Sequence, residues 1–187
     1  MIRVRSRRAW LAAGAIVLLA APAATADVTF EKPGIITSIG QSSDVAIVKV
    51  MLNTQLKLGL DYKPTAQAAD LAGIKTLVVV IGASTKGLGA AGLDMVREIE
   101  RTIVLLKAAR EKGVRVLALH TGGEARRGKT SNDLINLVVP ESDYVVVVAG
   151  GNKDRLFNTL AAKRNTPVVE VERTAAAGDA VKAVFRN

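Results

Sequence analysis

The chain has 187 residues, of which 49% are hydrophobic and 3% aromatic, with a formal net charge of +9 at pH 7, no cysteine and one histidine. The lack of cysteine excludes disulfides, thiol nucleophiles and cysteine-based metal sites. A single histidine excludes the usual zinc sites, which use two or three imidazoles. We therefore expect no bound metal.

The first 26 residues have the three parts of a cleavable signal peptide. Four arginines and no acidic residue stand among the first eight positions, an apolar run follows over residues 9–21, and Ala24-Thr25-Ala26 supplies an A-x-A cleavage site. The stretch Ser6-Arg7-Arg8-Ala9-Trp10-Leu11 resembles a twin-arginine signal. The alternative is an ordinary secretory head that contains an arginine pair. The pattern predicts a mature protein of residues 27–187 in the periplasm or outside the cell.

The mature chain keeps only a small basic surplus. Without the four arginines of the signal, 22 basic residues stand against 17 acidic ones, a formal net charge of +5. A nucleic-acid-binding protein would need a denser basic stripe with aromatic side chains to stack on bases, so nucleic acid is not an expected partner. No later segment is long and apolar enough to span a membrane, and the mature chain is expected to be soluble.

Apolar strands alternate with amphipathic helices along the rest of the chain. Strands are predicted over residues 35–39, 60–62, 76–82, 114–120, 144–149 and 167–171, the last as an edge strand. Helices are predicted over residues 42–58, 66–71, 93–112, 131–139 and 153–163, with a final one ending near Phe185. This alternation predicts a single doubly wound, mostly parallel α/β sheet with helices on both faces, flavodoxin-like or Rossmann-like.

The helix over residues 93–112 has the clearest period. Its predicted buried face consists of Leu93, Val96, Ile99, Ile103 and Leu106. The pairs Asp94–Arg97 and Glu98–Arg101 are expected on its solvent-exposed face.

Ligands of open parallel sheets bind where strands end at their carboxyl side, and three loops are predicted there, over residues 38–44, 82–92 and 120–129. The first loop opens into a helix that Ser42 or Ser43 would cap. Asp44 is expected only to reinforce the N-terminus of that helix.

The second loop is rich in glycine. Gly87 and Gly89 would let the backbone approach a ligand, and amides at a helix start attract anions. Ser84 and Lys86 add a hydroxyl and a positive charge. The alternative is a turn needed only for packing, with Lys86 in solvent.

The third loop carries Arg126 and Arg127 beside Glu124. A guanidinium matches a carboxylate or phosphate with two parallel hydrogen bonds, while Glu124 would pair with an arginine or hold the amine of a zwitterion. The alternative is a solvated charge cluster. His120, at the end of the preceding strand, is expected to be a hydrogen-bonded structural residue rather than a base. The candidate ligand-binding residues are Ser42, Ser43, Ser84, Lys86, Gly87, Gly89, His120, Glu124, Arg126 and Arg127.

Two nucleotide-binding patterns fail in the second loop. Gly87-Leu88-Gly89-Ala90-Ala91-Gly92 is a literal G-x-G-x-x-G, and residues 82–89 resemble the cofactor loop of short-chain dehydrogenases with one residue too many between the first two glycines. Neither Tyr62 nor Tyr144 is followed four residues later by lysine, so the catalytic Tyr-Lys pair of that family is missing. The P-loop pattern lacks its Lys and Ser/Thr. No cofactor, and in particular no NAD, is expected.

Three segments together resemble a known family. They are Gly40-Gln41-Ser42-Ser43-Asp44, the run from Ile81 to Gly92, and Gly122-Gly123-Glu124-Ala125-Arg126-Arg127-Gly128. The combination resembles a family of exported bacterial α/β proteins classed as a domain of unknown function, over about Pro33 to Val171. The resemblance implies a single exported α/β domain and supplies no catalytic residues.

These observations predict an exported domain that binds a small anionic or zwitterionic solute at the carboxyl ends of its strands, beside a transporter. The first alternative is an exported hydrolase or transferase acting on a small anionic compound, with Ser42, Ser43 or Ser84 as nucleophile and His120 as base. The second alternative is a structural or assembly module. No G-x-S-x-G motif follows a strand, which favours binding over hydrolysis.

Overall fold

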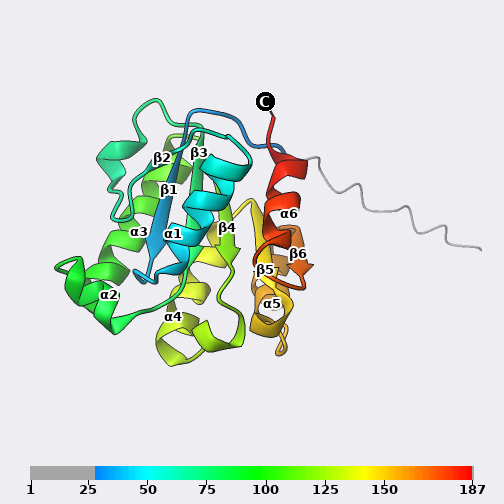
Figure 1. Cartoon of the computed structure of the whole chain (residues 1–187). Coiled ribbons are helices and arrows are strands. Elements are labelled where there is room, and N and C mark those ends of the chain that lie inside the picture. Colours follow the sequence, from blue (N-terminus) through cyan, green and yellow to red (C-terminus); the bar gives the residue numbers. More distant parts are fainter. Residues whose placement is uncertain (1–27, 187) are drawn as a thin grey trace, which may run out of the picture.

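A single parallel sheet organises the computed structural model, which describes residues 28–186 (Figure 1). The strands are β1 (Gly34–Ile39), β2 (Asp61–Tyr62), β3 (Thr76–Ile81), β4 (Arg115–His120), β5 (Tyr144–Val148) and β6 (Val168–Val171). Their order is β2-β1-β3-β4-β5-β6, and every neighbouring pair is parallel. The predicted α/β sheet is confirmed, with β6 at one edge.

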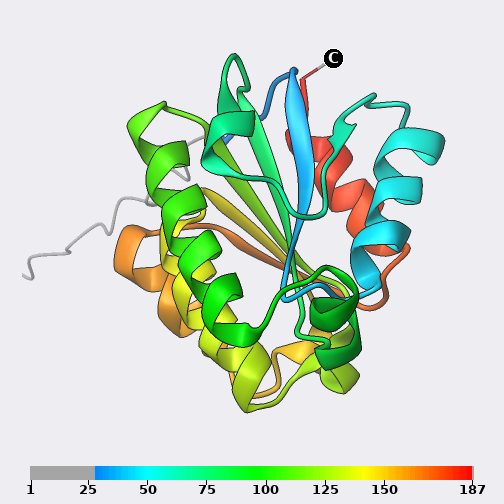
Figure 2. The same ribbon diagram turned by 90° about the vertical axis from the view of Figure 1, so that its left-hand side faces the viewer.

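Helices cover both faces of this sheet (Figure 2). One face carries α1 (Asp44–Lys49), its π-helical continuation η1 (Val50–Gln55) and α6 (Ala176–Val184). The other carries α3 (Met95–Glu111), α4 (Lys129–Val138) and α5 (Leu156–Ala161). The short elements are α2 (Thr85–Ala90) and the 3₁₀ turns η2 (Ala68–Leu71), η3 (Gly123–Arg126), η4 (Val139–Glu141), η5 (Ala149–Gly151) and η6 (Ala162–Arg164).

The strand β3 explains why the sheet is covered on both sides. Side chains alternate along a strand, so Leu77, Val79 and Ile81 pack toward α3 and α4. Val78 and Val80 pack toward α1 and α6. All six residues of β3 are buried, as the unbroken apolar run predicts.

The chain reverses its direction of winding at β1. From β1 it crosses to β2 on one side, and from β2 it returns to β3 on the other side of β1. The loops that leave β1 and β3 therefore lead to helices on opposite faces of the sheet. They leave from the carboxyl edge, which is the position where open α/β sheets bind ligands.

The predicted faces of α3 are wrong in part. Leu106 is buried and the Asp94–Arg97 pair is exposed, as predicted, but four other residues are reversed. Val96 and Ile103 are 66% and 49% exposed, whereas Glu98 and Arg101 are buried. The inward face consists of Glu98, Arg101, Thr102, Leu105, Leu106, Ala108 and Ala109. The helix is rotated relative to its apolar pattern because the two charged side chains meet polar partners from other segments.

Two other predicted segments differ in the structure. The glycine-rich loop over residues 82–92 contains the helix α2, and the predicted helix over residues 42–58 turns π-helical at Val50 and ends at Gln55. Ser43 stands at the N-cap position of α1 but makes no side-chain capping bond. No helix among residues 28–186 is both long and apolar enough to cross a membrane. The predicted signal peptide, residues 1–26, lies outside the described residues.

Candidate functional site

The loops after β1 and β3 are joined to each other at the carboxyl edge of the sheet. The amide of Ser42 donates to the carbonyl of Gly82 at 3.1 Å, and the amide of Ser84 donates to the carbonyl of Gly40 at 2.8 Å. Gln41 and Ala83 face each other between these bonds. The two loops thus form a short antiparallel bridge at the point where the winding reverses.

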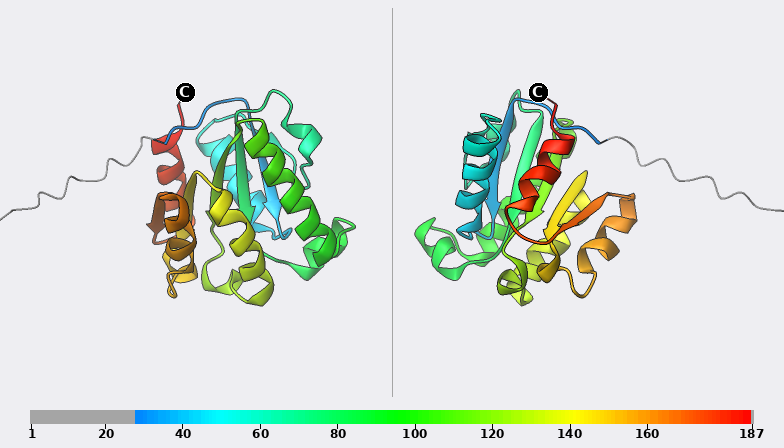
Figure 3. Two further views of the ribbon diagram at one scale, coloured as in Figure 1. Left: turned by 180° about the vertical axis from the view of Figure 1, so that it is seen from behind. Right: turned by 45° about the vertical axis from the view of Figure 1, so that its right-hand side comes forward.

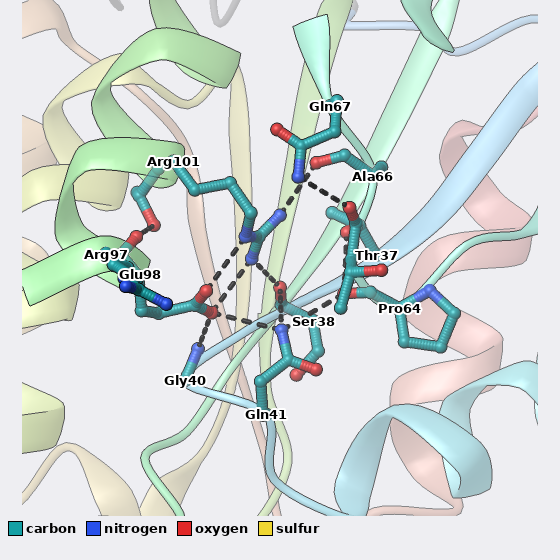
Figure 4. Close-up of polar contacts among 12 residues, drawn as sticks. Thr37, Ser38, Gly40, Gln41, Pro64, Ala66, Gln67, Arg97, Glu98 and Arg101 are labelled. Atoms are coloured by element: carbon teal, nitrogen blue, oxygen red, sulfur yellow. Dashed lines mark hydrogen bonds and ion pairs between the residues drawn. The ribbon is translucent and has the colours of Figure 1, made fainter. Parts of the chain in front are cut away.

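A buried ion pair on α3 holds the first of these loops in place (Figure 4). The Nε of Arg101 donates to Glu98 Oε2 at 2.8 Å, and the two side chains are 4% and 0% exposed. Glu98 Oε1 accepts hydrogen bonds from the amide of Gly40 at 2.6 Å and from Nε2 of Gln41 at 3.1 Å. Arg101 Nη2 also donates to the carbonyl of Ser38 at 2.5 Å. The pair therefore fixes the backbone that precedes Ser42.

A polar cluster of Ser42, Ser43, Asp44 and Arg126 lies beside this loop. Asp44 is the first residue of α1, and its Oδ2 accepts from the hydroxyl of Ser42 at 3.1 Å and from Nε of Arg126 at 3.2 Å. Nη2 of Arg126 donates to the hydroxyl of Ser43 at 3.3 Å. The side chain of Asp44 is 11% exposed and that of Arg126 is 31% exposed. The cluster is therefore a shielded carboxylate that orients a more accessible guanidinium.

Two glycines make room for this cluster. A Cβ at Gly122 would lie 2.6 Å from Asp44 Oδ2 and 2.0 Å from Cγ of Arg126. A Cβ at Gly82 would lie 2.9 Å from the hydroxyl oxygen of Ser42. Only glycine lets the loops after β3 and β4 close this tightly on the start of α1. Asp44, Gly82 and Gly122 were not among the predicted site residues. The signal that could have found Asp44 is the short polar run Ser42-Ser43-Asp44, which opens a helix at a strand end.

The glycine-rich segment over residues 82–92 forms a capped helix, whereas the sequence predicted a loop whose free amides would bind an anion. Ser84 caps α2, because its hydroxyl accepts the amide of Gly87 at 3.1 Å. The amide of Gly87 thus has a partner inside the protein. Gly89 lies within the exposed part of α2, and Lys86 is exposed. These residues shape the rim of the loop and are not brought into contact with Arg126.

Arg127 points away from Arg126 and holds the loop after β5. Its Nη2 donates to Asp154 Oδ2 at 2.7 Å, its Nε donates to Asn132 at 2.8 Å, and its Nη1 donates to the carbonyl of Gly151. Hydrogen bonding to Arg127 lowers the pKa of Asp154, the largest of the causes that act on it. The arginine is thus occupied by protein groups, which indicates a structural role.

Glu124 also lies apart from the cluster. It pairs with Lys153 at 2.5 Å, and both side chains are exposed. Hydrogen bonding to Lys153 lowers the pKa of Glu124. Of the ten predicted residues, the structure brings Ser42, Ser43 and Arg126 together, and it distributes the other seven around them.

His120 is buried beneath the loops. Its Nδ1 lies 3.0 Å from the carbonyl oxygen of Ile81 and its Nε2 lies 3.3 Å from that of Gly123, while the ring packs at 5.2 Å from the ring of Phe157. Burial lowers the pKa of His120, and this effect outweighs the two carbonyl groups, which act in the opposite direction. This environment agrees with the structural histidine predicted from the sequence.

The burial of His120 predicts a pH dependence of stability. The unfolded chain binds the proton more readily than the folded chain, so stability is complete above the unfolded pKa of 6.5 and is lost as pH falls below it toward the folded pKa. The chain has one histidine, which isolates the effect. Urea unfolding should show a free energy that is flat from pH 8 to 7 and declines below pH 6.5, by at most about 1.4 kcal/mol per pH unit. His120→Asn should flatten this decline, and a variant that keeps the full slope would contradict the assignment.

Among residues 28–186, no group of three or more His, Asp or Glu side chains is arranged to hold a metal ion.

The fold and site define a parallel α/β domain whose switch-point loops gather a shielded carboxylate, two serines and an oriented arginine. The chain belongs to the family described as "Domain of unknown function (DUF6305)", whose model matches residues 31–185. This match confirms the predicted resemblance to a domain of unknown function, while the export of the family's members stays a prediction.

Comparison with other proteins adds no activity. No curated protein matches the chain. Among solved structures, the chain is similar to hydroxymethylglutaryl-CoA lyase from Pseudomonas aeruginosa, with 16% sequence identity and a TM-score of 0.36 over 85% of this chain and 76% of that one. A likeness this weak carries no argument about function.

Proposed function

We propose that this chain is an exported protein that binds a small anionic or zwitterionic solute at the carboxyl edge of its sheet, beside a transporter. The observation that carries the proposal is the guanidinium of Arg126. It is held by Asp44 and Ser43 across 82 and 83 positions of sequence, and its Nη1 group has no protein partner among residues 28–186.

The arrangement of Arg126 suits the binding of an anion. Asp44 and Ser43 use the edge of the guanidinium that contains Nε, so the edge formed by Nη1 and Nη2 is available for two parallel hydrogen bonds to a carboxylate or phosphate. Because the side chain is already held, less conformational entropy is lost when a ligand binds. A zwitterion would add an ammonium group near Asp44.

The same geometry disfavours the hydrolase alternative. The hydroxyl of Ser42 donates to Asp44, and the hydroxyl of Ser84 caps α2. Within residues 28–186 no serine bonds to His120, both of whose ring nitrogens face backbone carbonyls. A nucleophile needs a base within hydrogen-bonding reach, and the described side chains do not form that pair.

The two adjacent arginines provide a matched test. A thermal-shift screen of carboxylates, amino acids and phosphate esters should identify an anion that stabilises the protein, and calorimetry then gives its Kd. Arg126→Ala should weaken binding ten-fold or more, since a hydrogen bond to a charged group contributes about 1.5–3 kcal/mol. Arg127→Ala should lower the Tm but leave the Kd within about two-fold. The proposal fails if no anion stabilises the protein or if both variants bind equally well.

Export is tested separately from binding. The protein recovered from outside the cytoplasm of its own host should begin at or near Asp27, because the A-x-A stretch precedes that residue. Intact-mass analysis measures this directly. A pool that retains residues 1–26 would contradict cleavage. Replacing Arg7 and Arg8 with lysine should block export only if the twin-arginine route is used.

A further inference from the structure

The helices α1 and α6 share one face of the sheet (Figure 3). An apolar groove lies on the surface between α1, with its continuation η1, and the residues just before α6; we call it the groove between α1 and α6. It has a volume of about 580 Å³ and is lined by Ala46, Ile47, Val50, Met51, Gln55, Thr174 and Ala175. Ile47 and Val50 are 54% and 46% exposed. The two walls touch at the base, where a Cβ at Gly178 would lie 3.2 Å from Cγ of Met51. A volume of this size suits a small organic ligand.

The α1 wall of the groove leads to Arg126. Residues three, four and seven apart lie on one side of a helix, so Ser43, Ile47 and Val50 form a continuous stripe. Ser43 stands at the start of this stripe, and its hydroxyl accepts the hydrogen bond from Nη2 of Arg126. The guanidinium is therefore placed at one end of an exposed apolar surface.

The opposite wall of the groove, just before α6, is also connected to Arg126. Thr174, just before α6, donates from its hydroxyl to the carbonyl of Thr121 at 3.0 Å. Thr121 precedes Gly122, which lies directly against Arg126 and Asp44. The hydroxyl of Thr121 is buried and has no hydrogen-bond partner within residues 28–186.

We propose that the solute is an amphipathic monocarboxylate, with its carboxylate on Arg126 and its apolar tail in the groove between α1 and α6. This inference rests on the proposed anion site and extends it by naming the class of ligand. Asp44, at 3.2 Å from Arg126, offsets much of the local positive charge. A singly charged carboxylate therefore suits the site better than a phosphate ester with nearly two charges. The exposed apolar side chains of the groove lose water only if the ligand has a tail.

A series of straight-chain carboxylates tests this proposal by calorimetry on the purified protein. From acetate to octanoate, the affinity should rise roughly two- to four-fold for each added methylene, as expected when a methylene is half to wholly removed from water. Octanol and octylammonium share the tail but lack the carboxylate, and each should bind at least ten-fold more weakly than octanoate. Arg126→Ala should reduce the affinity for octanoate and acetate by the same factor.

Variants of exposed apolar residues distinguish the contribution of the ligand's apolar tail to binding from that of its carboxylate. Ile47→Ser should weaken octanoate binding at least three-fold and leave acetate binding unchanged. Val104→Ser is the matched control, because Val104 on α3 is 55% exposed and lies on the opposite face of the sheet. It should change neither affinity.

The binding measurements distinguish a failure of the amphipathic-ligand proposal from a failure of the anion site at Arg126. If anions bind through Arg126 but the affinity does not depend on tail length, the amphipathic ligand is wrong and the anion site stands. If affinity rises with tail length but octanol binds as well as octanoate, the groove is an apolar docking surface independent of Arg126, and this proposal is overturned. If no carboxylate of any length binds, the amphipathic ligand is wrong, and the anion site is then decided by the amino acids and phosphate esters of the thermal-shift screen.

Discussion

Replacing Arg101 with methionine is expected to lower the free energy of unfolding by about 3–5 kcal/mol, because Glu98 would remain buried without its charged partner. The side chains of Glu98 and Arg101 are 0% and 4% exposed, and two hydrogen bonds of 2.8 Å join them. A change of this size corresponds to a fall in Tm of roughly 6–20 °C for a domain of this length. Urea unfolding of the variant measures the loss directly.

The expected loss extends beyond α3, because the pair also binds the loop after β1. The carbonyls of Ser38 and Ala66 would lose the hydrogen bonds that Arg101 donates to them. The carboxylate of Glu98, which accepts from the amide of Gly40 and the side chain of Gln41, would no longer be held in position. Buried polar groups without partners are costly. We therefore expect Arg101→Met also to weaken anion binding at Arg126, although neither residue of the pair contacts the proposed ligand.

Two control variants test whether the loss arises from an unpaired buried charge. The double variant Glu98→Met with Arg101→Met should lose less than the sum of the single variants, since it leaves no unpaired charge. Lys107→Met breaks an exposed pair with Glu111 on the same helix and should change stability by no more than about 0.5 kcal/mol. If Arg101→Met costs as little as Lys107→Met, the ion pair does not hold the loop.

The same ion pair explains what the sequence pattern predicted incorrectly. Charged residues three apart on a helix usually face solvent, so Glu98 and Arg101 were expected outside and Val96 and Ile103 inside. The structure reverses both expectations. The partners that make burial of the charges possible, such as Gly40, lie almost sixty residues away in sequence. A local apolar period contains no information about partners at that distance.

The candidate site was predictable at the level of loops but not of side chains. The carboxyl ends of β1, β3 and β4 meet at one edge because the strands are parallel, as the alternation of apolar strands and helices indicates. The sequence could not distinguish Arg126 from Arg127. Neighbouring residues at a 3₁₀ turn point about 120° apart, and at the end of η3 this sends Arg126 to Asp44 and Arg127 to Asp154.

Gly87→Ala and Gly89→Ala are expected to have opposite effects on stability, although both change glycine to alanine in the six-residue helix α2. A Cβ at Gly87 would lie 1.9 Å from the carbonyl oxygen of Gln41, whereas a Cβ at Gly89 would meet no atom within 4 Å. Gln41 cannot easily move, because its φ of 56° is in the left-handed region and its side chain is bonded to Glu98.

Gly87→Ala should therefore cost about 1–3 kcal/mol, the usual range for an inserted group that meets packed atoms, and more if α2 separates from the loop after β1. Gly89→Ala should stabilise the protein by up to about 1 kcal/mol, because alanine loses less backbone entropy in a helix. Urea unfolding of the two variants under the same conditions measures the difference, which should be at least about 1.5 kcal/mol. If both glycines serve mainly to let a ligand approach, as the glycine-rich sequence first indicated, neither alanine should change stability greatly and both should weaken anion binding. A large loss of stability at Gly87 alone would show instead that its missing side chain is required by the backbone of Gln41, and that α2 and the loop after β1 are held together as one rim of the anion site.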